Sequence, residues 1–149
     1  MLPNMLLQKF PAEEFSTITK FDFNPNFIGD KTGLIIFGLD YAYLSVVKKE
    51  DGNYLSAVIC KKADKGSAEK EFFSKKINAN TIYFKATVKT GAICQFAFAE
   101  DGNNFVNLPD TFTAQPGKWV GAKIGLFALG ATKTNNIGFS NIDWFRFTK

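Results

Sequence analysis

The chain has 149 residues, of which 46% are hydrophobic, 15% aromatic and 21% charged, and its net charge is +4. This length and composition fit one ordinary domain with a hydrophobic core, and they exclude disordered and fibrous proteins. The absence of histidine excludes Ser-His-Asp and Cys-His nucleophile systems, histidine general bases and His-ligated zinc, and two cysteines cannot supply a four-cysteine metal site.

The small excess of positive charge is spread along the chain. Lysine doublets such as Lys48-Lys49, Lys61-Lys62 and Lys75-Lys76 stand at the ends of predicted strands. A nucleic-acid-binding protein would gather its basic residues on one face and carry a recognisable motif. The longest apolar run, residues 33–39, is too short to span a bilayer. We therefore expect neither a nucleic-acid nor a membrane partner.

Short stretches of alternating apolar and polar residues dominate the chain. In chain order, the clearest are residues 41–48, 81–89, 93–98 and 139–147. A period of two is typical of β-strands with one buried face, and the β-branched and aromatic residues in these stretches suit a pleated surface.

Turn signals separate these stretches, and they decide the fold class. Glu-Asp-Gly-Asn occurs at residues 50–53 and again at 100–103, and Asp-Gly supplies the positive φ of tight hairpins. The best helical candidate is residues 67–76, although its Phe72-Phe73 pair fits a strand as well. About ten short strands at roughly 8–12-residue spacing predict an all-β fold, an antiparallel two-sheet β-sandwich. No linker divides the chain, so we expect one domain over residues 1–149.

The two cysteines allow two interpretations. Cys60 and Cys94 both lie in apolar, strand-like stretches. They are either two buried free thiols or a disulfide between neighbouring strands. The sequence leaves both open.

The first seven residues lack the basic start and the long apolar stretch of a secretory signal peptide. We therefore expect either a cytoplasmic protein or a piece of a longer exported chain. The sequence does not choose between these two compartments.

The acidic residues do not predict a catalytic site. Most of the 14 aspartates and glutamates stand in turns or in stretches of mixed charge, whereas a catalytic pair needs a pocket that raises one pKa. Asp143 differs, because it lies among phenylalanines on the 139–147 strand and must be paired there. A hydrogen bond to the backbone at a bulge and a calcium ion are the two interpretations. Nothing resembles an EF-hand loop, so we predict no metal and no cofactor.

Aromatic side chains are the candidates for binding. A flat ring can stack on the apolar face of a sugar, and Tyr41, Tyr43, Tyr54 and Trp119 are the candidate carbohydrate contacts. Each of them also fits a core position with a satisfied O–H or N–H group. Trp119 opens the apolar segment 120–129, which fits core or inter-domain packing as well.

Four segments of the chain carry a resemblance to a known family: residues 31–44, 91–105, 119–128 and 141–147. The most specific string in them is Trp-Val-Gly-Ala-Lys-Ile-Gly-Leu-Phe, whereas the closing Asp-Trp-Phe is common to many lectin-like sandwiches. In this order the segments resemble the C-terminal β-sandwich of family 43 glycoside hydrolases, the β-xylosidases and α-arabinofuranosidases. The resemblance runs from about Leu6 to Phe147.

The resemblance implies a concanavalin A-like jelly roll. In that family the sandwich packs beside a five-bladed β-propeller, which carries an Asp general base, a Glu general acid and a second Asp, and which inverts the anomeric centre. The resemblance therefore implies a non-catalytic accessory domain that buttresses and partly caps the propeller in hemicellulose degradation. The propeller would be the partner of this chain.

The resemblance also concerns the start of the chain. The family's sandwich begins with an additional N-terminal segment, and this chain enters partway through it. We therefore expect residues 1–3 to be an artificial or misassigned start, and residues 6–10 to form an unpaired or irregular edge.

Two other classes of function remain. A free-standing carbohydrate-binding module or lectin-like domain for xylo- or arabino-oligosaccharides would present one contiguous row of exposed aromatic rings. An interaction protein would present an exposed apolar patch of several hundred Å².

Overall fold

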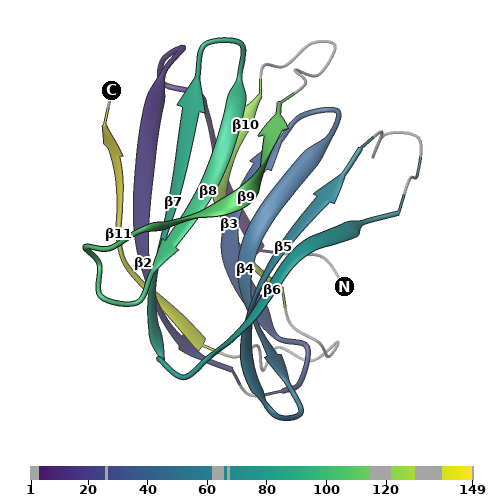
Figure 1. Cartoon of the computed structure of the whole chain (residues 1–149), viewed down its shortest axis with the longest axis vertical. Coiled ribbons are helices and arrows are strands. Elements are labelled where there is room, and N and C mark those ends of the chain that lie inside the picture. Colours follow the sequence, from purple (N-terminus) through teal and green to yellow (C-terminus); the bar gives the residue numbers. More distant parts are fainter. Residues whose placement is uncertain are drawn as a thin grey trace.

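The protein consists of two β-sheets that pack face to face (Figure 1). A computed structural model describes residues 4–25, 27–61, 66, 68–114, 122–129 and 139–148, with the backbone alone for residues 4–6 and 139–148. These residues form eleven strands, and none of them lies in a helix that could cross a membrane. The predicted antiparallel two-sheet sandwich is confirmed, with one strand more than expected.

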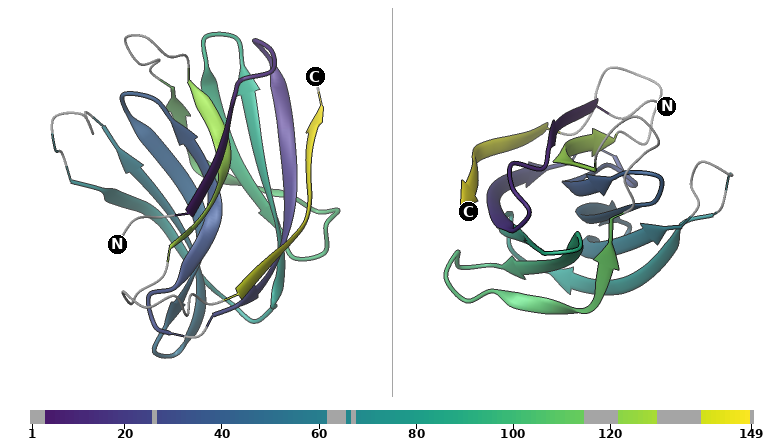
Figure 2. Two further views of the ribbon diagram at one scale, coloured as in Figure 1. Left: turned by 180° about the vertical axis from the view of Figure 1, so that it is seen from behind. Right: turned by 90° about the horizontal axis from the view of Figure 1, so that it is seen from above.

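Each sheet combines strands from distant parts of the chain, so the chain crosses between the layers (Figure 2). All neighbouring strands are antiparallel. The six-stranded sheet contains, in spatial order, β1 (Asn4–Lys9), β10 (Lys123–Leu129), β3 (Lys31–Phe37), β4 (Tyr41–Lys49), β5 (Gly52–Cys60) and β6 (Lys70–Ile77). The five-stranded sheet contains β11 (Phe139–Thr148), β2 (Phe15–Asn24), β7 (Thr81–Lys89), β8 (Ile93–Ala99) and β9 (Val106–Thr113).

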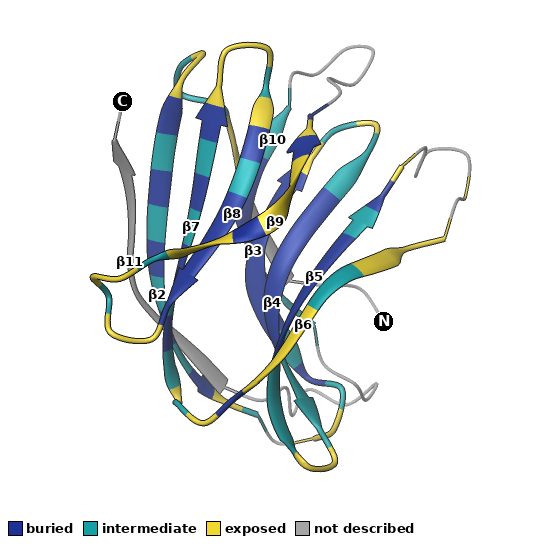
Figure 3. Cartoon of the chain, in the orientation of Figure 1, coloured by how far each residue is buried: buried dark blue, intermediate teal, exposed yellow. Residues whose placement is uncertain are grey.

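The alternation in the sequence becomes an alternation of burial along the strands. In β7 every second residue is buried and the residues between are half-buried, and β2 shows the same pattern (Figure 3). Side chains on successive strand residues point to opposite faces, so a period of two directs one set into the core. The buried set of β7 is Ile82, Phe84, Ala86 and Val88.

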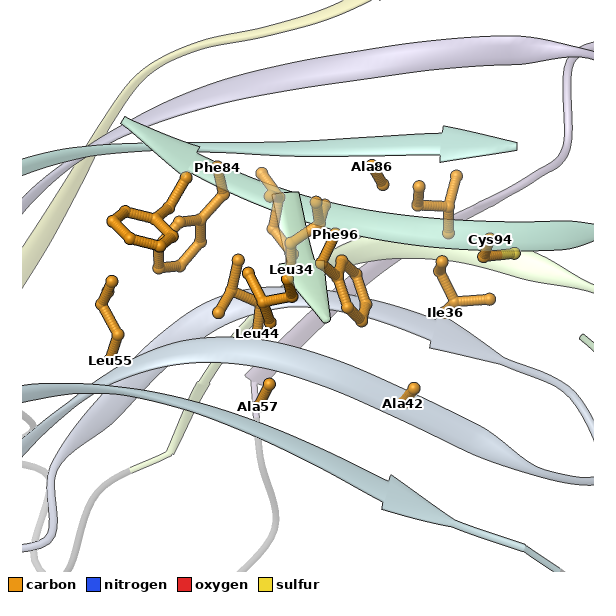
Figure 4. Close-up of a cluster of buried hydrophobic side chains, with 14 of the residues drawn as sticks. Leu34, Ile36, Ala42, Leu44, Leu55, Ala57, Phe84, Ala86, Cys94 and Phe96 are labelled. Carbon is orange, nitrogen blue, oxygen red and sulfur yellow. The ribbon is translucent and has the colours of Figure 1, made fainter. Parts of the chain in front are cut away.

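The core fills the space between the two sheets (Figure 4). Phe84 and Phe96 from the five-stranded sheet belong to one buried cluster with Leu34 and Leu44 from the other. Burying one such side chain contributes about 1.5–3 kcal/mol, so these contacts hold the layers together. The phenylalanines of this core are Phe15, Phe21, Phe23, Phe84, Phe96, Phe98 and Phe112.

Strand β1 is an edge of the six-stranded sheet. It pairs with β10 alone, in a continuous register from Asn4↔Ala128 to Lys9↔Lys123. Strand β1 therefore lies at an edge, as expected, but the prediction that this edge would be unpaired or irregular is wrong, because its pairing with β10 is regular. The truncated start at residues 1–3 lies outside the described residues and stays a prediction.

The helical candidate at residues 67–76 is wrong, because β6 occupies Lys70–Ile77. This strand pairs with β5, and Phe73 lies opposite Ala57. The ring of Phe73 lies 6.0 Å from the ring of Phe98, on the opposite sheet. Contacts with the core therefore override the local pattern of this charged segment.

The cysteines lie in different sheets as free, buried thiols. Cys60 ends β5 in the six-stranded sheet, and Cys94 lies in β8 in the five-stranded sheet. Burial raises the pKa of Cys94 to about 12. The structure therefore favours the first of the two interpretations, two small buried hydrophobic side chains.

Candidate functional site

The outer face of the six-stranded sheet carries a second apolar cluster, separate from the core. Ile35, Tyr43, Val58 and Phe127 come from four strands, and each is at most 7% exposed. They reach this face because strand residues alternate, so that their neighbours, such as Leu34, point into the core. Leu7, Tyr41 and Leu129 pack against the cluster and are partly buried.

Four aromatic rings form a contiguous row on this face. Tyr41 lies opposite Phe37 in the β3–β4 pair, and their ring centroids are 6.0 Å apart with an interplanar angle of 14°. Tyr43 is two residues along β4, with its ring 6.3 Å from that of Tyr41 and inclined by 12°. Phe127 is the last ring of the row. Its ring centroid lies 5.1 Å from that of Tyr43, in an edge-to-face arrangement.

Two charged side chains complete the arrangement. Glu69 precedes β6 and accepts a hydrogen bond from each tyrosine, at 2.5 Å from the Tyr41 phenol and 2.9 Å from the Tyr43 phenol. Lys31 donates to the Tyr43 oxygen at 3.2 Å, and its Nζ lies 5.3 Å from the centre of that ring. The two phenols thus hold a carboxylate beside the row of rings, and that of Tyr43 also holds an ammonium group there.

The two phenols are donors rather than reactive groups. Burial raises the pKa of Tyr41 and that of Tyr43 well above the usual value, and the hydrogen bonds and charge of Glu69 raise both further. Both groups therefore stay protonated at neutral pH. They can orient Glu69 but cannot serve as bases or nucleophiles there.

These side chains surround a hollow of about 250 Å³, which we call the tyrosine hollow. Its walls are the four rings together with Ile35, Leu129, Lys31 and Glu69. A concave, mostly apolar surface with a few placed polar groups is the usual pattern of a small-molecule binding site.

A larger hollow of about 470 Å³ lies where the free edges of β6 and β9 approach. Ile59 and Phe72 contribute apolar surface, and Lys70 and Asp110 stand on its two sides. Among the described residues that line it, Phe72 is the one with an aromatic ring. The tyrosine hollow, with four rings and an ordered carboxylate, is the stronger candidate for a binding site.

The structure brings together two of the four predicted carbohydrate contacts, Tyr41 and Tyr43. Tyr54 lies apart from the hollow, where its phenol donates to Asp51 at 2.9 Å and Lys49 lies 4.5 Å from its ring centre. Trp119 lies outside the described residues.

Asp143 falls on β11 at an irregularity of the sheet. The register of β11 against β2 shifts between Ile142 and Trp144, so a bulge is present at this position. The side chain of Asp143 lies outside the described residues, and neither its hydrogen bond nor its calcium ligation is tested.

Three carboxyl groups have a pKa that is lowered, whereas acid catalysis needs one that is raised. Hydrogen bonds from Thr90 lower the pKa of Glu14, and a hydrogen bond from Tyr54 lowers that of Asp51. Backbone hydrogen bonds from the 101–104 turn lower that of Asp101. A glycosidase acid requires a raised pKa. In the described part of the chain, no three potential metal ligands lie together.

Six residues of the hollow were not among the predicted contacts: Lys31, Ile35, Phe37, Glu69, Phe127 and Leu129. Strand geometry places Lys31, Ile35 and Phe37 on one face of β3, but residues 33–37 are apolar throughout, so no alternation in the sequence marks that face. No local signal marks Glu69 either, which lies within the segment considered as a helix.

Comparisons with known proteins identify the family. A family model described as the beta-xylosidase C-terminal concanavalin A-like domain matches residues 1–148. This chain belongs to that family. The resemblance and the concanavalin A-like sandwich predicted from the sequence are thereby confirmed.

Relatives of this domain are much longer proteins. A beta-xylosidase of Formosa agariphila is 33% identical over 72 residues, which are 48% of this chain and 12% of that protein. A bifunctional GH43-CE protein of Bacteroides eggerthii has a TM-score of 0.86 and 20% identity, over 97% of this chain and 19% of that one. A GH43 protein of Bacillus licheniformis has a TM-score of 0.80 and 19% identity, over 97% and 29%. The match thus spans less than a third of each of these three proteins.

Proposed function

We propose that this domain is a non-catalytic accessory part of a family 43 hydrolase that degrades xylan or arabinan, and that it buttresses and partly caps a catalytic propeller. The observation that carries this proposal is the match to the C-terminal domain of beta-xylosidases over residues 1–148. The relatives are several times longer than the chain, which leaves room in them for a catalytic domain.

The surface supports a contact with another domain. Among the described residues, exposed large apolar side chains gather at the two ends of the sandwich. Leu39 and Ile93 are 39% and 44% exposed beside the β3–β4 and β7–β8 turns, which lie at the same end (Figure 1). Phe27 and Ile28 lie in the turn between β2 and β3. A contiguous apolar patch is typical of an interaction surface, and these side chains are the candidates for one.

The gene itself provides the first test. We expect a propeller-coding region in frame upstream of this sequence in genomic DNA. A complete gene that encodes the sandwich alone would overturn the accessory role.

Enzyme assays provide the second test. The purified chain should release no nitrophenol from aryl β-xylosides or aryl α-arabinofuranosides, whereas the longer protein should do so. Turnover by the isolated chain would contradict the proposed division of labour.

A free-standing carbohydrate-binding module is the second candidate function. The contiguous row formed by Phe37, Tyr41, Tyr43 and Phe127 favours it. This candidate and the accessory role are separable, because sugar binding does not require the propeller.

A further inference from the structure

We propose that the tyrosine hollow binds one neutral sugar residue, a terminal pentose such as xylose or arabinose, on the accessory domain itself. The choice of a pentose rests on the function proposed above. The preference for a neutral, hydroxyl-rich ring rests on the hollow alone.

The rings provide the apolar part of the site. Phe37 is 38% exposed and stands at the open end of the row, and Tyr41 follows it at a nearly parallel angle of 14°. The C–H face of a sugar ring can pack on such a surface and remove both from water. Tyr43 and Phe127, which are buried, support the row from below.

Glu69 and Lys31 can form further hydrogen bonds with the hydroxyl groups of a sugar. A carboxylate accepts about four hydrogen bonds, and the two phenols supply two of them to Glu69. An ammonium group has three N–H donors, and one of them serves the Tyr43 oxygen. Glu69 can therefore accept from two sugar hydroxyls, and Lys31 can donate to a third oxygen. Because the phenols already fix Glu69, little further ordering is needed on binding.

The mixture of charges selects a neutral ligand. Lys31 lies over the Tyr43 ring and takes the position in which a cationic ligand would be attracted. Glu69 lines the hollow, and the negative charge of Glu71 also acts on Tyr43, so an anion is disfavoured. A wholly apolar ligand would remove water from Glu69 and Lys31, and it would offer no hydrogen bonds in place of those that the water had made. A molecule with hydroxyl groups on an apolar ring meets all three conditions.

The size of the hollow limits the ligand to a small one. Its volume of about 250 Å³ lies below the range of roughly 300–1,000 Å³ that holds drug-sized ligands. One sugar residue is therefore expected to enter, and a chain of several residues is expected to extend out of the site.

The test uses the purified chain and two probes, methyl β-D-xylopyranoside and methyl α-L-arabinofuranoside, in two-dimensional amide NMR titrations. At least one of them should give saturable shifts at Lys31, Ile35, Tyr43 and Glu69. Cyclohexanol provides the apolar ring without the array of hydroxyl groups. It should bind at least about tenfold more weakly, since hydrogen bonds to charged groups contribute that much.

Matched variants locate the site. Glu69→Gln should weaken sugar binding about tenfold, and Phe37→Ala at least about fivefold. Glu71→Gln, two residues from Glu69, and Ile93→Ala, an exposed apolar residue outside the hollow, should change it less than about twofold. Circular dichroism confirms that each variant is folded.

Three results would overturn the proposal: no saturable shift with either sugar, shifts that map elsewhere, or equal affinity for cyclohexanol. The accessory role would survive any of them, because it is tested by the upstream gene sequence. Conversely, a missing propeller gene would leave a positive titration intact.

Discussion

The Tyr43 phenol donates a hydrogen bond to Glu69 at 2.9 Å, across 26 positions of the sequence and across β5, the strand that lies between β4 and β6. Tyr43 is 5% exposed near the centre of its sheet, whereas Glu69 is exposed at the start of β6, which forms an edge. This bond ties the segment before an edge strand to the middle of the sheet, and Tyr41 adds a second tie to the same carboxylate.

Removal of the Glu69 carboxylate should therefore destabilise the fold. We expect Glu69→Ala to lower the free energy of unfolding by about 1–3 kcal/mol, because the buried Tyr43 phenol loses its acceptor. Urea unfolding followed by circular dichroism measures this. Glu13→Ala, an exposed carboxylate in the turn before β2, should change stability by less than about 0.5 kcal/mol. Equal effects of the two substitutions would show that the phenol–carboxylate bonds contribute nothing.

Alkaline pH should weaken the fold through the same tyrosines. Burial and Glu69 raise the pKa of Tyr41 and Tyr43 in the folded state above the value of about 10 in an unfolded chain. The folded state then holds these protons more tightly. The resulting stability is complete below pH ~10 and is lost as pH rises above it.

Thermal unfolding between pH 8 and pH 11 measures this loss. The melting temperature of the double variant Tyr41→Phe, Tyr43→Phe should fall less steeply above pH ~10 than that of the unchanged protein. Burial also raises the pKa of Cys94, to about 12, but this thiol contributes equally to both proteins. Tyr83→Phe is the control and should keep the steep fall. Parallel curves for all three proteins would refute the effect.

The strands could be predicted from the sequence because their signals are local. In β7, Ile82 and Phe84 alternate with half-buried neighbours, and the Gly52 and Gly102 turns adopt the positive φ values, +139° and +79°, that Asp-Gly predicts. The same alternation placed Tyr41 and Tyr43 on one face of β4.

The polar half of the hollow could not be predicted, because its geometry depends on the order of strands in the sheet. Glu69 meets Tyr41 and Tyr43 only because β5 and β6 follow β4 in space, and nothing near Glu69 in the sequence specifies this. Phe127 reaches Tyr43 for a similar reason, since β10 inserts between β1 and β3. The charged residues around Phe72 and Phe73 also allowed a helix until pairing with β5 decided for a strand.

The two thiols should form no disulfide, and in the folded protein they should be inaccessible to thiol reagents. Cys60 and Cys94 are 2% and 1% exposed, and a thiol that is buried in this way reacts slowly, because reagents cannot reach it. Ellman's reagent should find about two thiols per chain in guanidinium chloride and almost none in the native protein during the first minutes. The titration is made without reductant, so a disulfide would give no thiol in the denatured sample and would contradict this arrangement.

Gly33 should tolerate no side chain, because β4 passes too close to it. A Cβ at this position would lie 2.1 Å from the carbonyl oxygen of Leu44 and 2.8 Å from the Cα of Ser45, and both are backbone atoms of the adjacent strand. Gly33→Ala therefore has to displace β3 from β4, which should cost about 1–3 kcal/mol or more. The shift would also disturb Ile35 and Tyr43, which pair in the same two strands.

Gly91→Ala is the matched control. Gly91 has a φ of +87° and no atom within 4 Å of the added Cβ, so alanine there meets backbone strain alone, of about 1 kcal/mol. Gly33→Ala should accordingly lower the urea midpoint more than Gly91→Ala does, and it should shift the amide resonances of β3 and β4. If Gly33→Ala is as stable as Gly91→Ala, the close approach of these two strands is wrong, and so is the spacing that forms the row of rings.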